Sequence, residues 1–220
     1  IRLMYCYPEE ITDELIDTIA EEPKLCHYLD IPIQHASDEI LRRMGRRTDQ
    51  KSICSLIGKL RERIPDIVLR TTLMTGFPGE TEEDFETLAD FVNEMEFDRL
   101  GVFAYSAEEG TKAAQMSGQI PDEVKEKRRE EIMLLQQEIA YDLNRERIGK
   151  RMTVFIEGKL TEENTFVGRT YMDAPEVDGL IFLPATSSAR EWMSGDFAEV
   201  FVTDAKGYDL IGEFIDESAK

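Results

Sequence analysis

The sequence predicts two domains: an α/β domain of parallel strand–helix units over residues 1–148, and a small antiparallel β-barrel over residues 149–220. Two patterns carry this prediction. Up to about residue 106, strand-like runs alternate with amphipathic helical runs, which is typical of a parallel sheet with right-handed crossovers. After Gly149, five short strand-like runs separated by turns indicate a small five-stranded barrel of the oligonucleotide-binding (OB) type.

The α/β domain is expected to run strand, helix, strand, helix, helix, strand, helix, strand. Helices are assigned from apolar residues at helical spacing, and strands from β-rich runs that end at Gly or Pro. Pro32 limits the second strand, because proline cannot donate to a sheet ladder. The expected strands are 1–7, 28–35, 67–75 and 99–106, and the expected helices are 9–22, 37–44, 49–63 and 81–95.

The rest of the chain is organised around the Gly-Phe-Pro-Gly turn after the third strand. Gly76 and Gly79 allow close backbone approach or positive φ, and Pro78 stiffens the turn. Thr81 is the expected N-cap of the next helix, with Asp84 completing a loose capping box. Such a turn either approaches a ligand or serves only as a well-capped connection, and spacing alone leaves both open.

A long charged helix over residues 121–147 is predicted between the two domains. Pro121 suits its first position, and the acidic residues that follow suit its first turn. A narrow apolar stripe along this helix favours packing across the sheet with a solvated charged face. Beyond it, the five barrel strands are expected at 152–157, 165–171, 180–183, 198–202 and 210–214.

The composition of the chain limits which kinds of partner and which cellular location can be expected. The net charge is −20, so the chain repels phosphate backbones unless it hides a basic patch, and a basic protein is the expected partner. Cys6, Cys26 and Cys54 fit neither a disulfide framework nor an iron–sulfur or zinc spacing, which favours a cytoplasmic location. No apolar run reaches the roughly 20 residues of a membrane helix. The chain starts without Met on a strand-like run, so we expect a piece of a longer protein.

Polar and aromatic residues that could bind a ligand lie at the carboxyl ends of the predicted strands. In parallel α/β folds these ends meet at one side of the sheet, where ligands bind. The segments that fall there are Tyr7-Pro8, Gln34-His35, Thr75-Gly76-Phe77 and Tyr105-Ser106. Their convergence predicts a binding site more strongly than any one of them.

Several motifs resemble the radical S-adenosylmethionine (SAM) methylthiotransferases, and the resemblance spans nearly the whole chain. It implies a partial parallel (β/α) barrel of the radical SAM type, followed by a TRAM domain like that of the branch that modifies a ribosomal protein. The motifs are PIQHAS at 32–37, ILRRMGRR at 40–47, GFPGET at 76–81, FAYS at 103–106, EGT at 109–111 and GRTYMDAPEVDG at 168–179.

The resemblance implies SAM as cofactor and two 4Fe-4S clusters in the full-length protein. Family members hold a cluster on a Cys-x-x-x-Cys-x-x-Cys loop after the first barrel strand, and no such spacing occurs here. Residue 1 aligns near the third of six barrel strands. We therefore expect this chain to lack the cluster ligands, to hold no metal and to be inactive alone.

The resemblance also implies which residues meet the cofactor, while the catalytic residues stay unidentified. The turn residues would lie against the nucleoside, and strand-end polar residues would meet its ribose, amino or carboxylate groups. For Gln34, His35 and Thr72 the alternative is a structural hydrogen bond, and for Tyr105 it is a core position. The implied cofactor-binding residues are Gln34, His35, Arg70, Thr72, Gly76, Phe77, Pro78, Gly79 and Tyr105.

Two branches of the family differ in substrate: one modifies a tRNA adenosine, the other the β-carbon of an aspartate in ribosomal small-subunit protein twelve. Residues 151–220 contain six Lys and Arg against fourteen Asp and Glu, so they suit a basic protein better than tRNA. Asp173, Glu176 and Asp178 are the expected partner-binding residues. The tRNA enzyme, a non-catalytic acidic adaptor, and an acidic tail that only aids solubility remain as alternatives.

Overall fold

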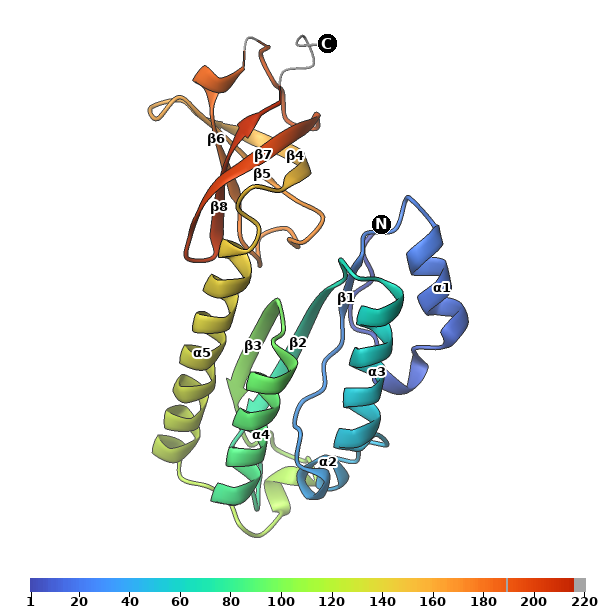
Figure 1. Cartoon of the computed structure of the whole chain (residues 1–220). Coiled ribbons are helices and arrows are strands. Elements are labelled where there is room, and N and C mark those ends of the chain that lie inside the picture. Colours follow the sequence, from blue (N-terminus) through green and yellow to red (C-terminus); the bar gives the residue numbers. More distant parts are fainter. Residues whose placement is uncertain (189, 216–220) are drawn as a thin grey trace. The chain divides into compact units, whose positions relative to one another are not determined.

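The computed structural model describes residues 1–188 and 190–215, and the chain divides into two compact units, Ile1–Ile139 and Ala140–Lys220. The first unit contains a parallel sheet with helices, and the second contains a closed β-barrel (Figure 1). Helix α5 (Asp122–Arg145) contributes residues to both units. The expected succession of an α/β part, a long helix and a small barrel is confirmed.

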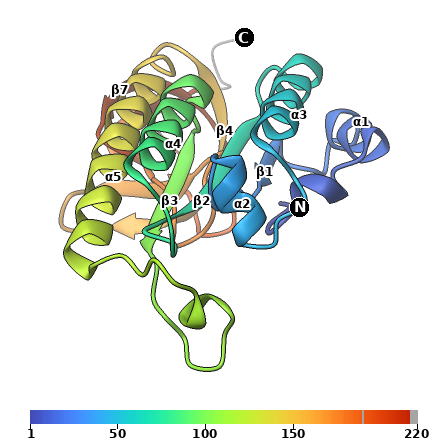
Figure 2. The ribbon, with the colours of Figure 1, turned by 90° about the horizontal axis from the view of Figure 1, so that it is seen from below.

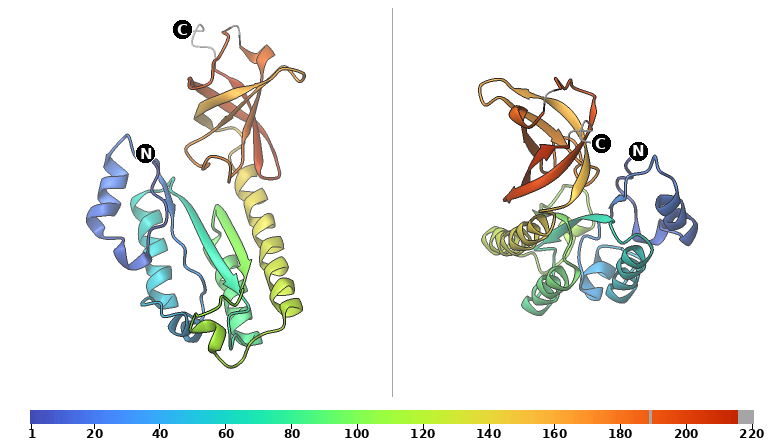
Figure 3. Two further views of the ribbon diagram at one scale, coloured as in Figure 1. Left: turned by 180° about the vertical axis from the view of Figure 1, so that it is seen from behind. Right: turned by 45° about the horizontal axis from the view of Figure 1, so that its top comes forward.

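The sheet of the first unit has three parallel strands in the order β1 (Tyr28–Asp30), β2 (Val68–Thr75) and β3 (Arg99–Ala104). The α-helices lie on one face of this sheet, and among the described residues the opposite face carries no α-helix (Figures 2 and 3). The first unit thus forms part of a parallel (β/α) barrel. Its helical elements are η1 (Pro8–Glu10), α1 (Asp13–Glu21), α2 (Asp38–Arg43), α3 (Gln50–Arg63), α4 (Glu82–Met95) and η2 (Ala113–Gln115), with the start of α5.

Side-chain alternation along β2 explains this one-sided arrangement. Leu69 and Leu73 are fully buried against the helices. Arg70, Thr72 and Met74 point to the other face and are only half-buried. Because successive side chains of a strand point to opposite faces, the helix-free face of β2 is its polar one.

Side-chain caps fix where the helices begin. Ser37 accepts a hydrogen bond from the Ile40 N–H at the start of α2, as the sequence predicts. Thr81 and Asp84 form a complete capping box at the start of α4. Thr12 and Asp49 cap α1 and α3 in the same way, so α1 begins later than expected, after the short η1 turn. Each such cap stabilises a helix by about 1 kcal/mol.

Two predicted strands are shorter than expected. Residues 1–7 run beside β1 but form only one bridge, between Leu3 and Leu29, and Tyr5 adopts φ 60°, which ends an extended run. The segment 28–35 is regular only over β1, because Pro32 cannot continue the ladder. Pairing resumes at Gln34 with a single bridge to Leu73.

The second unit is a closed barrel with the strand order β4-β5-β6-β8-β7. Four of its five pairings are antiparallel, but β6 and β8 pair in parallel, so an all-antiparallel barrel is not what forms. The end of α5 packs on this unit through Asn144, which donates to the Gly207 carbonyl at 3.0 Å, and through the Tyr141–Tyr208 ring pair. The remaining elements are β4 (Arg151–Leu160), β5 (Thr165–Arg169), β6 (Ile181–Pro184), η3 (Ala185–Ser187), β7 (Phe197–Lys206) and β8 (Asp209–Phe214).

Candidate functional site

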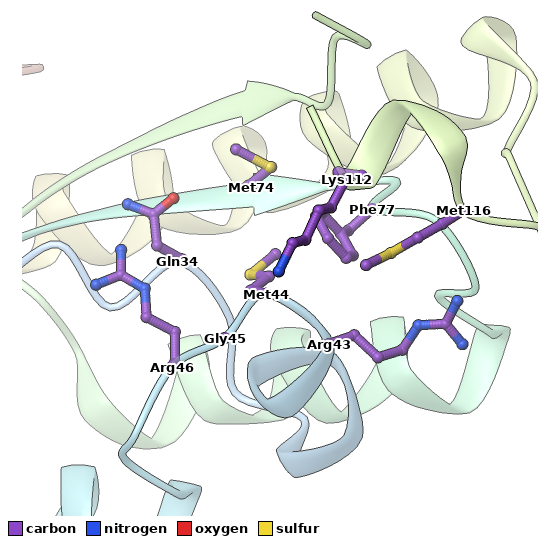
Figure 4. A pocket seen from close by; sticks show the side chains of 10 residues that line it. Gln34, Arg43, Met44, Gly45, Arg46, Met74, Phe77, Lys112 and Met116 are labelled. Atoms are coloured by element: carbon purple, nitrogen blue, oxygen red, sulfur yellow. The ribbon is translucent and has the colours of Figure 1, made fainter. Parts of the chain in front are cut away.

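A pocket of about 520 Å³ lies in the first unit at the carboxyl ends of β1 and β2 (Figure 4). Its wall comes from the segment after β1, the end of α2, the end of β2 with the turn that follows, and the segment around η2. That segment extends to the side of the sheet opposite the helices (Figure 2). The lining residues are Gln34, Arg43, Met44, Gly45, Arg46, Met74, Phe77, Lys112, Ala113 and Met116.

Backbone conformation places Gln34 in this wall. Its φ is 77°, its N–H donates to the Thr72 carbonyl at 2.9 Å, and its own carbonyl accepts from the Met74 N–H at 2.8 Å. A positive φ is uncommon for a residue other than Gly, and it persists only where the surroundings hold it. These two bonds to β2 hold Gln34 at the edge of the pocket.

The Gly-Phe-Pro-Gly turn is packed too closely for larger residues at its glycines. A Cβ on Gly76, at φ 74°, would lie 2.1 Å from Lys125 Cγ, and a Cβ on Gly79, at φ 87°, would lie 2.5 Å from Arg43 Cζ. The Gly79 N–H also donates to the Gly118 carbonyl at 2.8 Å, which ties the turn to the η2 segment. The predicted close approach of the backbone therefore occurs, and its neighbours are side chains of this chain.

A buried carboxylate holds the turn in place. Glu80 has a fully buried side chain; it accepts a hydrogen bond from the Gly76 N–H at 2.7 Å and another from Arg128 Nη1 at 2.7 Å. Burial works against the charge of Arg128, but its hydrogen bonds to Glu82 and Glu80 outweigh burial and raise its pKa. Glu80 thus links the turn to α5.

His35 is buried next to Glu80 and does not line the pocket. Its ring is fully buried, and its Nδ1 accepts from the Ser37 N–H at 2.9 Å, so the ring proton belongs on Nε2. Nε2 lies 3.4 Å from Glu80 Oε2 but makes no hydrogen bond among the described residues. His35 thus makes a structural hydrogen bond through Nδ1, and its contact with the cofactor stays a prediction.

The same network reaches α4 through Asp84. Partial burial opposes ionisation of Asp84, but hydrogen bonds from Ser37 and Thr81 outweigh it and lower the pKa of this carboxyl below its usual range. The Ser37 hydroxyl donates to Asp84 Oδ1, while the same hydroxyl caps α2. One carboxylate thus joins the starts of α2 and α4 beneath the pocket.

Phe77 lines the pocket, and Tyr105 packs against its ring. Their rings meet edge to face with centroids 5.3 Å apart, and both are nearly buried. The Tyr105 hydroxyl is buried without a hydrogen-bond partner among the described residues, and Lys125 Nζ lies 5.4 Å from the centroid of its ring. Tyr105 therefore supports Phe77 from behind, and Pro78 is likewise buried outside the lining.

Arg70 and Thr72 lie outside the pocket wall. Both sit on the helix-free face of β2, where Arg70 Nη1 lies 3.3 Å from Oδ1 of the buried Asp30. The structure therefore brings only Gln34 and Phe77, of the nine sequence-predicted cofactor residues, into the lining itself. Gly76 and Gly79 are not lining residues, but Gly79 packs against Arg43, which is one.

Sequence reasoning gave no role to the three cations of the wall. Arg43, Arg46 and Lys112 line the pocket, and no carboxylate does. Arg43 and Arg46 belong to the motif at 40–47. No sequence pattern near residue 112 indicates that Lys112 would lie beside that motif. The end of α2 and the η2 segment meet only in the folded chain.

Among the described residues, no group of three or more His, Cys, Asp and Glu side chains has an arrangement that could hold a metal ion. Cys6, Cys26 and Cys54 are free and half-buried. Burial raises the pKa of the Cys6 thiol, with the charge of Asp30 adding to the effect, and burial also raises the pKa of Cys54. Iron–sulfur clusters are held by closely spaced cysteines, and the sequence positions of these three do not have that spacing.

A raised pKa leaves less thiolate at any given pH. We therefore expect iodoacetamide to alkylate Cys6 and Cys54 more slowly than free cysteine at about pH 8, with a rate that climbs only at higher pH. Peptide mass spectrometry across a pH series measures both rates. Labelling of either residue as fast as free cysteine would contradict the assigned environments.

The predicted partner residues of the second unit differ in exposure. Asp173 is buried, and its Oδ2 accepts from the Thr170 hydroxyl at 2.8 Å. Asp178 is half-buried and accepts from the Ala174 N–H at 2.8 Å. Glu176 is exposed. The first two carboxylates hold the loop, and Glu176 is the one fully presented to solvent.

Comparison with known proteins identifies the family. The model of the radical SAM superfamily matches residues 1–92, and that of the TRAM domain matches residues 148–215. A protein of Lachnoclostridium phytofermentans described as "Ribosomal protein uS12 methylthiotransferase RimO" is 60% identical over 212 residues, which cover 96% of this chain and 48% of the relative. The chain belongs to the radical SAM methylthiotransferase family.

Further comparisons agree with this methylthiotransferase family. A relative from Carboxydothermus hydrogenoformans with the same description is 50% identical, over 99% of this chain and 49% of its own length. The chain spans about half the length of these curated relatives. The solved structure of coproporphyrinogen III oxidase (HemN) from Escherichia coli, a radical SAM enzyme, matches with a TM-score of 0.53 and 24% identity over 64% of this chain and 33% of its own, which bears on the fold alone. In the described part of the chain, every helix is too short or too polar to span a membrane.

Proposed function

We propose that the whole protein inserts a methylthio group at the β-carbon of an aspartate in ribosomal small-subunit protein uS12. The observation that carries this proposal is the 60% identity, across 96% of the chain, to a relative described as a uS12 methylthiotransferase. Since the chain spans about half of that relative, the activity is proposed for the whole protein.

For the cofactor, the pocket fits a nucleoside with an attached amino acid. Phe77 offers an aromatic edge, Gln34 an amide and Arg43 a guanidinium whose Nε is buried without a hydrogen-bond partner among the described residues. SAM, when bound, supplies the 5′-deoxyadenosyl group and the methyl chemistry of this enzyme class. We assign Gln34, Phe77 and the backbone of Gly76–Gly79 to holding it, with Pro78, His35 and Tyr105 supporting the turn.

The roles of Arg70 and Thr72 toward the cofactor stay part of the proposal, because their half-buried side chains face the helix-free side of the sheet. The 4Fe-4S clusters of the family would be held by cysteines that this chain does not contribute. We propose two such clusters for the whole protein, and we derive no step through them.

For the partner, the acidic second unit favours a basic protein. Residues 151–220 carry a net charge of −8, and opposite charges accelerate encounter and fix orientation. We propose that this unit contacts uS12, displayed alone or on the small subunit, with Glu176 at the contact. A tRNA substrate would need a basic face to neutralise phosphates, so we do not extend the proposal to it.

The decisive experiment offers the cluster-bearing enzyme uS12 and tRNA in the same reaction, with SAM, a one-electron reductant and sulfide as the sulfur source. We expect mass spectrometry to find the added methylthio group on one aspartate of uS12 and unmodified adenosine in the tRNA. Omission of SAM is the control and leaves both substrates unchanged. Modification of tRNA in place of uS12 would contradict the proposal.

A further inference from the structure

Two large phenylalanine side chains of β7 lie on the outside of the closed barrel. Buried and exposed residues alternate along the first part of this strand, so Phe197, Glu199 and Phe201 share its outer face. Phe197 is 68% exposed and Phe201 is 41% exposed. Single exposed apolar side chains are ordinary, but neighbouring ones are a mark of interaction surfaces. The outside of β7 is therefore a candidate contact surface of the second unit.

The neighbouring strand β4 widens this surface. Phe155 is the register partner of Phe197, and the two rings meet edge to face with centroids 5.3 Å apart. The Arg169 guanidinium lies 4.9 Å from the centroid of the Phe155 ring, and its Nε lies 2.6 Å from Glu157 Oε1. This arginine is therefore already paired with a carboxylate. Phe155, Phe197 and Phe201 together form what we call the outer aromatic face.

The charges around the outer aromatic face are acidic on balance. Glu199 lies between the two exposed rings of β7. Glu213 of β8 and Arg151 of β4 are the register partners of Phe201, and both are exposed. The arginine–glutamate pair beside this face cancels, so among the described residues two carboxylates stand against one guanidinium. Surfaces that follow a phosphate backbone are rich in Lys and Arg, so this balance favours a cationic group of a protein over a nucleic acid.

The spacing along β7 suits one cationic side chain. Side chains two positions apart on a strand are separated by roughly 7 Å. An ammonium or guanidinium is attracted to an aromatic ring within about 6 Å of its centroid. A cation placed between Phe197 and Phe201 can therefore contact both rings and pair with Glu199. The Thr153 hydroxyl donates to the Glu199 carboxylate, which orients that carboxylate on the outer face.

We propose that Phe197, Glu199 and Phe201 bind a lysine or arginine side chain of uS12, so that the outer aromatic face docks this basic protein on the second unit. This inference rests on the proposed function and deepens it by assigning the contact to a defined face of the barrel. The net charge of −8 over residues 151–220 supplies attraction at long range, and the rings with their carboxylate supply the contact at short range.

The test measures the affinity of the cluster-bearing enzyme for uS12 and for a single-stranded RNA oligonucleotide. Phe197→Ala is expected to weaken uS12 binding about 10-fold, and Phe197→Leu, which keeps an apolar side chain without a π face, by nearly as much. Glu199→Gln is expected to weaken it about 5-fold. Leu134→Ala is the matched control, because Leu134 is 62% exposed on α5 in the first unit. Thermal unfolding checks that each variant is folded.

The sign of the charge effect separates a protein partner from RNA. Glu199→Gln removes a negative charge, which weakens attraction for a basic protein and strengthens it for a phosphate backbone. The inference is overturned if Phe197→Ala leaves uS12 affinity unchanged, if Leu134→Ala weakens it equally, or if the phenylalanine variants weaken only RNA binding. Failure of the proposed function gives a different result, since wild-type enzyme would then bind no uS12, whereas equal affinities of wild type and variants contradict this inference alone.

Discussion

Replacing Glu80 by Ala is expected to lower the free energy of unfolding by about 3–5 kcal/mol, the cost typical of removing one partner from a buried ion pair. The carboxylate is fully buried, and its loss leaves the Gly76 N–H without its acceptor and Arg128 with one carboxylate in place of two. Urea unfolding followed by circular dichroism measures the change. SAM affinity should fall with it, because the turn loses its anchor.

Glu82 is a matched control for this variant. It pairs with the same arginine at the same distance, 2.7 Å, but 73% of its side chain is exposed. Ion pairs in contact with solvent contribute little. We therefore expect Glu82→Ala to change stability far less than Glu80→Ala. Equal effects of the two variants would show that burial of Glu80 is not what makes it important.

A methyl group at Gly76 is expected to have the second large effect. Gly76→Ala forces a left-handed residue, at about 1–2 kcal/mol, and overpacks the site against Lys125, at about 1–3 kcal/mol more. Gly76 lies at the end of β2, so the turn must shift and SAM affinity should drop. Calorimetric titration with SAM and urea unfolding measure the two consequences separately.

Gly149→Ala separates strain from crowding in that experiment. Gly149 has a similar φ, 86°, but no atom lies within 4 Å of a Cβ built on it. This control variant should show the conformational cost alone and leave SAM binding unchanged. If Gly76→Ala destabilised the protein no more than Gly149→Ala, close packing against Lys125 would not be the reason for a glycine in the turn.

Local chemistry made much of the fold predictable. The capping box of Thr81 and Asp84, the cap at Ser37 and the glycine that ends α2 follow from residues within a few positions of one another, and all of them occur. The strands expected at 1–7 and 28–35 were too long because one unusual φ, at Tyr5, and one missing donor, at Pro32, interrupt pairing. Such interruptions depend on neighbours that an apolar pattern does not reveal.

The candidate site was less predictable because its wall is assembled from distant segments. Gln34 and Phe77 could be placed there, since strand ends of a parallel sheet converge. Lys112 could not be placed there, because no pattern in the surrounding sequence indicates that the η2 segment folds back over the end of α2. The parallel pairing of β6 with β8 could not be predicted for the same reason. The sequence shows where short strands occur, but it does not show which strands pair.

Closure of the second unit restricts how it can recognise another protein. Each of its strands has a neighbour on both sides through the order β4-β5-β6-β8-β7, with β7 returning to β4. An open sheet presents unpaired backbone groups to which an extended peptide can add as a further strand, and a closed barrel presents none. A partner of this unit must therefore be recognised by side chains and loops. For the same reason two copies cannot associate edge to edge through their backbones, which protects an isolated barrel from sheet-driven aggregation.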